Sequence, residues 1–194
     1  AAYDEALRRY LAALGPDAMQ IGWVTNNIGW VHRRLDNYDL SRDWFLKAEP
    51  IIVRHEGRYS RNAGKVAINL GIIEHYLGNQ DAAIRWVMKA MPYIQANNEI
   101  TLEEQRWAYD AMARAFRAKG DTRRAIAFAK LAVNAQQSIR SANKQLSENE
   151  SKELKDEWRW LYQHLADMLI DEGRFAEAQA VLNMEKEQEV FEFL

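Results

Sequence analysis

A unit of helix, turn and helix recurs along this chain, and this repeat restricts the possible folds more than any other feature of the sequence. The clearest copy spans residues 66–94. Apolar residues fall at i, i+4, i+7 and i+11 twice in this copy, first at Val66, Leu70, Ile73 and Leu77, and then at Ala83, Val87, Ala90 and Ile94. Each set lines one face of a helix. Gly78-Asn79 separates the sets, and both residue types tolerate the left-handed conformation that ends helices. The pattern predicts an αα-hairpin.

Gly71 lies inside the first of these helices, where glycine costs about 1 kcal/mol relative to alanine. Two antiparallel helices approach closely only where the facing residues are small. We therefore expect Gly71 and Ala83 to lie where the two helices meet.

The unit recurs with turns at Asp36-Asn37, Gly120-Asp121 and Gly173-Arg174. A large and a small residue precede each turn, at Ile28-Gly29, Met112-Ala113 and Leu165-Ala166. The four turns, at positions 36, 78, 120 and 173, are 42, 42 and 53 residues apart. A regular internal period indicates stacked helical units. The chain also has only three prolines and no long alternation of apolar and polar residues, so the prediction is an all-α fold.

The repeat also predicts where the elements begin and end. We expect hairpins at 21–54, 64–96, 105–142 and 150–190 in a single solenoid over residues 1–194, with residues 1–15 as the second helix of a truncated repeat. The longer third gap predicts an extended helix, a loop near Ser147, and a restart in which Ser147 and Glu150 have capping-box spacing. Both ends resemble cuts in a longer protein; the alternative is a small protein whose apolar ends pair in a dimer.

These residues resemble the tetratricopeptide (TPR) pattern. Leu70-Gly71, Gly78, Ala83 and Ala90 occupy the places where that family has its Leu-Gly pair, its turn glycine and two alanines. The 42-residue spacing departs from the usual 34 and resembles the long-helix variety of kinesin light chains and many bacterial proteins. The resemblance implies an α-solenoid of TPR-like helix-turn-helix hairpins.

The last repeat carries a narrower resemblance. The run "LADMLIDEGRFAEAQAVLNMEKEQEVFEF" is similar to the last repeat before the caspase-like CHAT domain of bacterial TPR-CHAT proteins. The resemblance implies that a His/Cys protease domain follows in the intact protein. This chain has no cysteine, so it cannot supply the nucleophile itself.

Composition and motifs argue against several classes of function. A net charge of −2 argues against a nucleic-acid or anionic-membrane surface. No run is long enough to span a membrane, no signal peptide opens the chain, and the absence of cysteine fits a reducing compartment, so we expect a cytoplasmic protein. The four histidines, His32, His55, His75 and His164, lack metal-ligand spacing. With no nucleophile elbow or phosphate-binding loop either, we expect no catalytic site, no metal and no cofactor.

The TPR resemblance also implies a binding surface, because the first helix of each hairpin lines a concave groove in that family. The groove candidates are Asn27, Trp30, Arg34, Asn69, Ile72, Tyr76, Asp110, Arg114, Arg117, Gln163 and Asp167. Asn27 and Asn69 resemble the asparagine ladder of peptide-binding TPRs, in which the amide bonds a peptide backbone; an amide offers both donors and an acceptor. Ala111 and His164 interrupt that ladder. The alternative is that the two asparagines bond their own helices or water.

Trp30, next to Arg33-Arg34, is the expected anchor, since tryptophan and arginine are favoured at binding hot spots. Unpaired Arg34 and Arg114 would favour acidic residues in the ligand. The other candidate surface is on the second helices, around Trp44 and Trp86.

The sequence therefore predicts a non-catalytic scaffold that binds a protein or peptide in its concave groove. The narrower expectation is the regulatory TPR region of a bacterial CHAT protease, which would contact the C-terminal domain of the same protein. The alternatives are a ligand-responsive regulator of the bacterial peptide-receptor type and a passive oligomerisation module.

Overall fold

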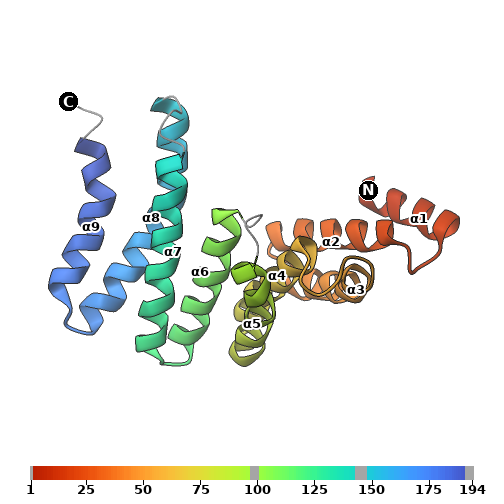
Figure 1. The fold of residues 1–194 in the computed structure, drawn as a ribbon, viewed down its shortest axis with the longest axis horizontal. Coiled ribbons are helices and arrows are strands. Elements are labelled where there is room, and N and C mark those ends of the chain that lie inside the picture. Colours follow the sequence, from red (N-terminus) through yellow and green to blue (C-terminus); the bar gives the residue numbers. More distant parts are fainter. Residues whose placement is uncertain (1, 97–100, 143–147, 191–194) are drawn as a thin grey trace. The chain divides into compact units, whose positions relative to one another are not determined.

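The computed structural model describes residues 2–96, 101–142 and 148–190, with side chains over 3–94, 101–142 and 158–184. This part of the chain forms nine helices (Figure 1). They are α1 (Ala2–Leu14), α2 (Met19–Arg34), α3 (Tyr38–Glu56), α4 (Arg61–Tyr76), α5 (Gln80–Ala96), α6 (Leu102–Ala118), α7 (Thr122–Ala142), α8 (Glu148–Asp171) and α9 (Phe175–Val190). The chain divides into two compact units, unit 1 (Ala1–Glu104) and unit 2 (Gln105–Leu194).

The expectation of one solenoid over residues 1–194, with residues 1–15 as part of a truncated repeat, stays a prediction. The predicted loop near Ser147 lies outside the described residues, and so does the side chain of its expected capping partner Glu150.

The four predicted turns all have left-handed backbone. The φ angle is 56° at Asp36, 81° at Gly78, 75° at Gly120 and 71° at Gly173. At the second turn, Gly78 N–H donates to the His75 carbonyl (3.0 Å) and Asn79 N–H donates to the Glu74 carbonyl (2.8 Å). This pair of bonds is the Schellman motif, which closes the last turn of a helix. The other three turns repeat it. The predicted all-α fold of helix-turn-helix hairpins is confirmed.

Small residues lie where the helices of each unit 1 hairpin come closest. A Cβ atom added to Gly71 would lie 2.4 Å from Val87 Cγ2 and 3.1 Å from the Ala83 carbonyl oxygen. A Cβ atom on Gly29, one repeat earlier, would lie 3.1 Å from the ring of Phe45. The expectation that Gly71 lies at the contact of its two helices is therefore correct. Ser41 takes the place of Ala83 in that earlier hairpin, and its buried hydroxyl donates to the Gly29 carbonyl (2.7 Å).

The core of unit 1 is formed by apolar side chains from α3 and α4, against which Trp86 of α5 packs. Phe45, Ala48, Ile52, Val66, Leu70 and Ile73 are almost completely buried. Burying one side chain of this size stabilises a fold by about 1.5–3 kcal/mol.

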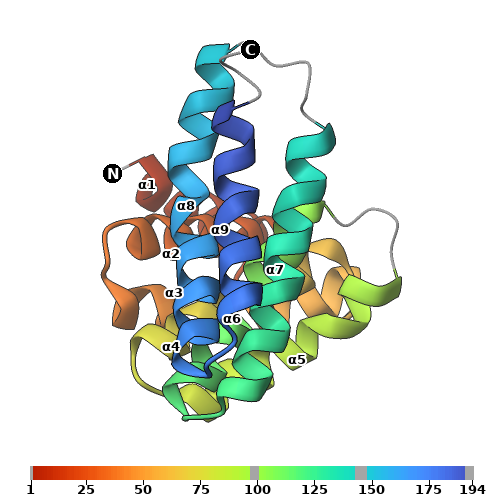
Figure 2. The ribbon, with the colours of Figure 1, turned by 90° about the vertical axis from the view of Figure 1, so that its left-hand side faces the viewer.

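Unit 2 is built from the same kind of hairpin. Phe116 of α6 stacks on Phe128 of α7, with ring centroids 5.6 Å apart. The buried side chains of α8 include Leu161, Leu165 and Leu169. α8 and α9 lie antiparallel and side by side, with α7 against α8 (Figure 2).

Candidate protein-binding surface

One face of α2 carries a row of exposed side chains, Trp23, Asn27, Trp30 and Arg34, at i, i+4, i+7 and i+11. We call this row the α2 stripe. Trp23 is 47% exposed and Trp30 is 48% exposed. The opposite face of α2, with Ile21, Ile28 and Gly29, is buried. The stripe therefore exposes two large aromatic side chains that the fold of unit 1 leaves half uncovered.

Three predicted site residues lie on the stripe, Asn27, Trp30 and Arg34. The Arg34 guanidinium carbon lies 5.5 Å from the centroid of the Trp30 ring, within the range of a cation–π contact. No described residue forms an ion pair with Arg34. Trp23 was not among the predicted groove residues, although its i−4 spacing from Asn27 places it on the same helix face. Its indole N–H donates to Glu56 Oε1 (3.2 Å).

α4 contributes Asn69 and Tyr76 to the same surface. Tyr76 is 49% exposed, and its ring stacks on Tyr38 with centroids 4.6 Å apart. The Tyr38 hydroxyl donates to Asp36 Oδ1 (2.7 Å), and this hydrogen bond raises the pKa of Tyr38 to about 12. Tyr76 therefore stacks on a Tyr38 ring that the hydrogen bond to Asp36 holds in place. We call Trp23, Asn27, Trp30, Arg34, Asn69 and Tyr76 together the α2–α4 surface.

Ile72 is left out of this surface because it is buried, and its role as a binding residue stays a prediction. Its side chain is only 7% exposed. Ile72 has the same place in its repeat as Trp30, but α4 packs against α3 and α5 and also contacts α2. An apolar side chain on a helix with neighbours on several sides is taken into the core.

Asn69 already has a partner on the neighbouring helix. Arg33 Nη1 donates to Asn69 Oδ1 (2.6 Å), and both side chains are partly buried. Burial lowers the pKa of Arg33, yet an arginine in a protein stays protonated. Arg33 therefore uses one of the two acceptor positions of the Asn69 oxygen, and the expectation that this amide bonds a peptide backbone stays a prediction.

Neither α2 nor α4, both described in full, exposes a carboxylate. The only acidic residue on the two helices is Glu74, which is 2% exposed. Glu74 accepts from Arg42 Nε (2.7 Å) and from Asn79 Nδ2 (2.8 Å). The cations of the same helices are Arg33, Arg34, Arg61 and Lys65. The two first helices of unit 1 therefore form a surface with a positive excess.

Two of these cations, near the N-terminus of α4, already form ion pairs. Arg61 and Lys65 contact Glu104 Oε1 at 3.0 and 3.1 Å. Burial alone would raise the pKa of Glu104, but hydrogen bonds from Lys65, Tyr93 and Arg61 outweigh it and lower the pKa. Arg34 is thus the predicted site cation with no ion pair to a described residue.

The two remaining predicted residues, Arg114 and Arg117, belong to unit 2. Arg114 Nε donates to Asp110 Oδ2 (2.8 Å), and the guanidinium lies over the Trp160 ring (4.5 Å). Arg117 lies 3.8 Å from Asp171 Oδ2. The expectation that Arg114 is unpaired is therefore wrong. The chain has an acid four residues before this arginine, a spacing that could have indicated the ion pair.

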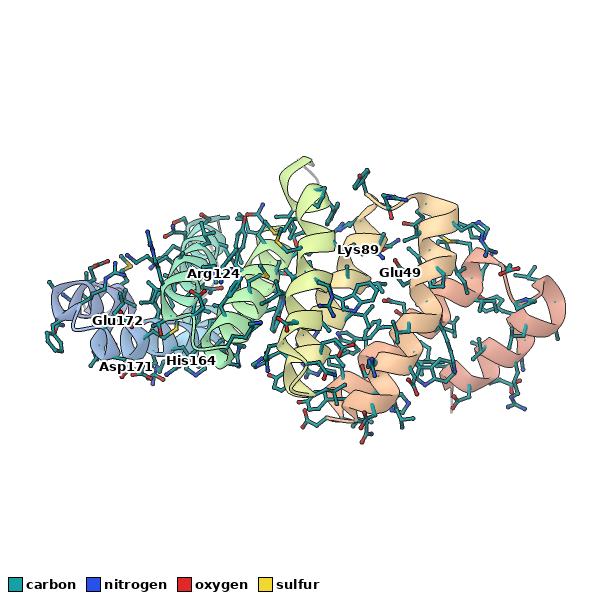
Figure 3. All side chains as sticks on the ribbon, turned by 90° about the horizontal axis from the view of Figure 1, so that it is seen from below. Glu49, Lys89, Arg124, His164, Asp171 and Glu172 are labelled. Atoms are coloured by element: carbon teal, nitrogen blue, oxygen red, sulfur yellow. The ribbon has the colours of Figure 1, made fainter. Side chains whose placement is uncertain are left out.

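The second helices of unit 1 carry a repeated contact that sequence reasoning missed. Lys47 lies over Trp44 (4.4 Å) on α3, and Lys89 lies over Trp86 (4.7 Å) on α5. Lys89 also forms an ion pair with Glu49 (2.5 Å), and Figure 3 shows these two side chains facing each other. Trp44 and Trp86 are both partly buried. They are therefore less available to a partner than the tryptophans of the α2 stripe.

Two of the four histidines form hydrogen bonds within the described part of the chain. His75 Nδ1 is 2.8 Å from Gln80 Oε1, and His55 Nε2 is 2.7 Å from the Asp17 carbonyl. Among the described residues, no group of three or more His, Asp and Glu side chains is placed to hold a metal ion. No helix in the described ranges is long and apolar enough to cross a membrane.

The fold is shared with a solved structure. The crystal structure of BtubC (BKLC) from P. vanneervenii matches with a TM-score of 0.73 and 17% sequence identity, over 95% of this chain and 69% of that chain. No family model and no curated protein matches the sequence. At this identity the likeness shows the fold alone. The chain is therefore an all-α helical-repeat protein whose sequential antiparallel hairpins are those of a TPR-like α-solenoid.

Proposed function

We propose that this chain is a protein-binding scaffold and that its α2–α4 surface binds an extended, acidic segment of a partner protein. The observation that carries the proposal is the pair of half-exposed tryptophans, Trp23 and Trp30, on one face of a helix that contains no acidic residue. Tryptophan and arginine dominate binding energy at protein interfaces, because both combine large contact area with polar groups.

The charge of the surface supports an acidic ligand. Arg34 has no carboxylate partner among the described residues, and the one acid of α2 and α4 is buried and bonded. An acidic segment would complement this charge and would be attracted more strongly at low salt. The stripe from Trp23 to Arg34 is about 16 Å long, from a helical rise of about 1.5 Å per residue. An extended segment of about five residues covers that length.

The test begins with a partner captured on the intact chain and identified. Binding of that partner is then titrated against the wild type and against Trp30→Ala. Because Trp30 is half exposed, its removal should leave the melting temperature nearly unchanged while it weakens binding by roughly 30-fold or more, as at a hot spot. Affinity should also fall as salt rises.

Arg123→Ala is the matched control, since Arg123 is exposed on α7, a second helix of unit 2. It should change neither binding nor stability. If Trp30→Ala binds like the wild type, the α2–α4 surface is not the site. The convex alternative around Trp44 and Trp86 would then be the surface to examine.

A narrower proposal concerns the protein to which this chain belongs. We propose that it is the regulatory region of a bacterial caspase-like protease of the TPR-CHAT type and is cytoplasmic. The similarity of residues 165–193 to the repeat that precedes the CHAT domain supports the first part, and the lack of cysteine supports the second. The sequence that follows Leu194 in the gene tests it. A His and a Cys in caspase-like spacing would support it, and a helix-turn-helix motif would contradict it.

A further inference from the structure

The contact between Arg33 and Asn69 fixes which way the Asn69 amide points. A guanidinium carries only donors, so the Asn69 atom 2.6 Å from Arg33 Nη1 must be the carbonyl oxygen Oδ1. The opposite orientation would place N–H against N–H. The assignment follows from the chemistry of arginine and does not depend on the position of any hydrogen atom.

The other end of the amide is left for a ligand. No described side chain or backbone group accepts a hydrogen bond from Asn69 Nδ2, and this nitrogen is not among the buried polar atoms that lack a partner. Asn69 is partly exposed, and its two N–H groups have no acceptor among the described residues. These N–H groups can therefore donate a hydrogen bond to an acceptor on a ligand.

The neighbouring polar groups of the α2–α4 surface are mainly donors as well. Arg34 is exposed and carries donors only, and the exposed Asn27 receives just a long bond from Asn26 Nδ2 (3.5 Å) at its own Oδ1. The Trp30 indole nitrogen is a donor too. α2 and α4 expose no carboxylate, and the Glu56 carboxylate beside Trp23 already accepts from the Trp23 indole and from Asn62.

We propose that Arg33 is a positioning residue, which holds the Asn69 amide with its N–H groups outward so that the surface reads hydrogen-bond acceptors on the bound segment. The group that meets Asn69 Nδ2 is an oxygen, either a backbone carbonyl or a side-chain carboxylate. This inference rests on the proposed function. It differs from a ladder in which the amide can turn either way, because the hydrogen bond to Arg33 fixes the orientation of the Asn69 amide.

Asn69→Asp separates the two roles of the amide. The aspartate keeps an oxygen for Arg33 and turns that hydrogen bond into an ion pair, so the fold of α2 against α4 is retained. The outward N–H groups are lost, and an acceptor takes their place. The probe is a decapeptide selected from a displayed random library on the wild-type chain and then synthesised. We expect Asn69→Asp to bind it roughly 10-fold or more weakly, the range for a lost hydrogen bond, without a lower melting temperature.

Controls separate positioning from structure. Asn134→Asp, an exposed amide on α7, should bind like the wild type. Arg33→Met frees the amide to rotate and should weaken binding, whereas Arg33→Lys restores a donor opposite Oδ1 and should recover part of it. In ¹H–¹⁵N spectra, the side-chain Nδ2 resonances of Asn69 should shift when the decapeptide is added to the wild type. They should shift less in Arg33→Met.

A second peptide, with each Asp and Glu replaced by Ala, identifies the acceptor, because alanine has no side-chain acceptor. If Asn69→Asp still weakens binding of this neutral peptide, the acceptor is a backbone carbonyl; if the effect disappears, it is a carboxylate. Undiminished binding of the original decapeptide by Asn69→Asp, when Trp30→Ala does weaken it, overturns the role of Arg33 and leaves the proposed function intact. A library that yields no binder to the α2–α4 surface overturns both.

Discussion

At Gly71, a single missing Cβ atom decides how closely α4 and α5 pack. Val87 Cγ2 occupies the space that a side chain at position 71 would need. This position could be predicted from the sequence because its cause is local and repeated, since a small residue recurs before every turn. The partner of Asn69 could not be predicted in this way. It depends on how α2 and α4 pack, and residues 33 and 69 hold different places in their repeats.

Gly71→Leu should lower the free energy of unfolding by about 1–3 kcal/mol or more, because the added side chain overpacks the contact with Val87. Chemical denaturation measures this. The control is the exposed Arg85→Ala, which should cost little. Lys89→Ala is a poorer control, since Lys89 covers Trp86 and pairs with Glu49. Equal losses for Gly71→Leu and Arg85→Ala would show that the packed face has been misassigned.

The charge state of His164 on α8 depends on its burial and on charged neighbours; Figure 3 labels the residue. Burial, and then the Arg114 guanidinium, lower the pKa of His164 below the ordinary value of 6.5, while Asp110 partly opposes them. The ring lies edge-on to Trp160 (5.4 Å). The folded state therefore favours neutral His164, and the unfolded state takes up the proton first as the pH falls.

The contribution of His164 to stability should be fully present above about pH 6.5 and should be lost as the pH falls below that value towards the folded pKa. Urea unfolding at pH 7.5 and 5.5 tests this. His164→Gln cannot titrate, so its stability should fall less between these two pH values than that of the wild type. An equal fall in both proteins would contradict the assignment.

At the scale of the helices, the turns were the most predictable feature and the exposed faces the least. Gly-Asn and Gly-Asp pairs at the ends of apolar periods indicate a Schellman turn, because few residues other than glycine adopt positive φ without strain. The left-handed turn at Asp36, with φ 56°, could be predicted from its place in the repeat and not from the residue type, because aspartate seldom adopts positive φ. Ile72 shows the opposite case. Its register matches that of Trp30, but α4 has more neighbours than the register alone reveals.

Gly120→Ala tests the turn between α6 and α7. Gly120 has φ 75°, and an added Cβ atom would meet no other atom within 4 Å, so any effect comes from backbone strain alone. We expect a loss of about 1–2 kcal/mol in unfolding free energy, measured by thermal or urea unfolding. Arg123→Ala, at an exposed position of α7 two residues after the turn, should change stability little. A neutral Gly120→Ala would mean that the backbone there is not left-handed in solution.

At the scale of the whole molecule, the polar character of the first helices differs between the two units. α2 and α4 of unit 1 expose cations and tryptophans with no exposed acid. In unit 2, Arg114 pairs with Asp110, and Arg117 lies near Asp171. The sequence predicted site residues in both units, because a register count treats all repeats alike. Only the structure shows which of the cations already have partners. We therefore place the proposed site in unit 1, while binding by Arg114 and Arg117 stays a prediction.

The most direct test of this account locates the bound partner on the chain. A photo-crosslinking residue is placed in turn at the exposed positions Trp30 and Tyr76 on the α2–α4 surface, and at Met88, which is 52% exposed on α5. Each variant is irradiated with the identified partner in excess, so that the partner still binds the variant that lacks the Trp30 side chain. The account predicts crosslinks from positions 30 and 76 and none from position 88. Crosslinks from position 88 alone would contradict it and would place the working surface on the second helices.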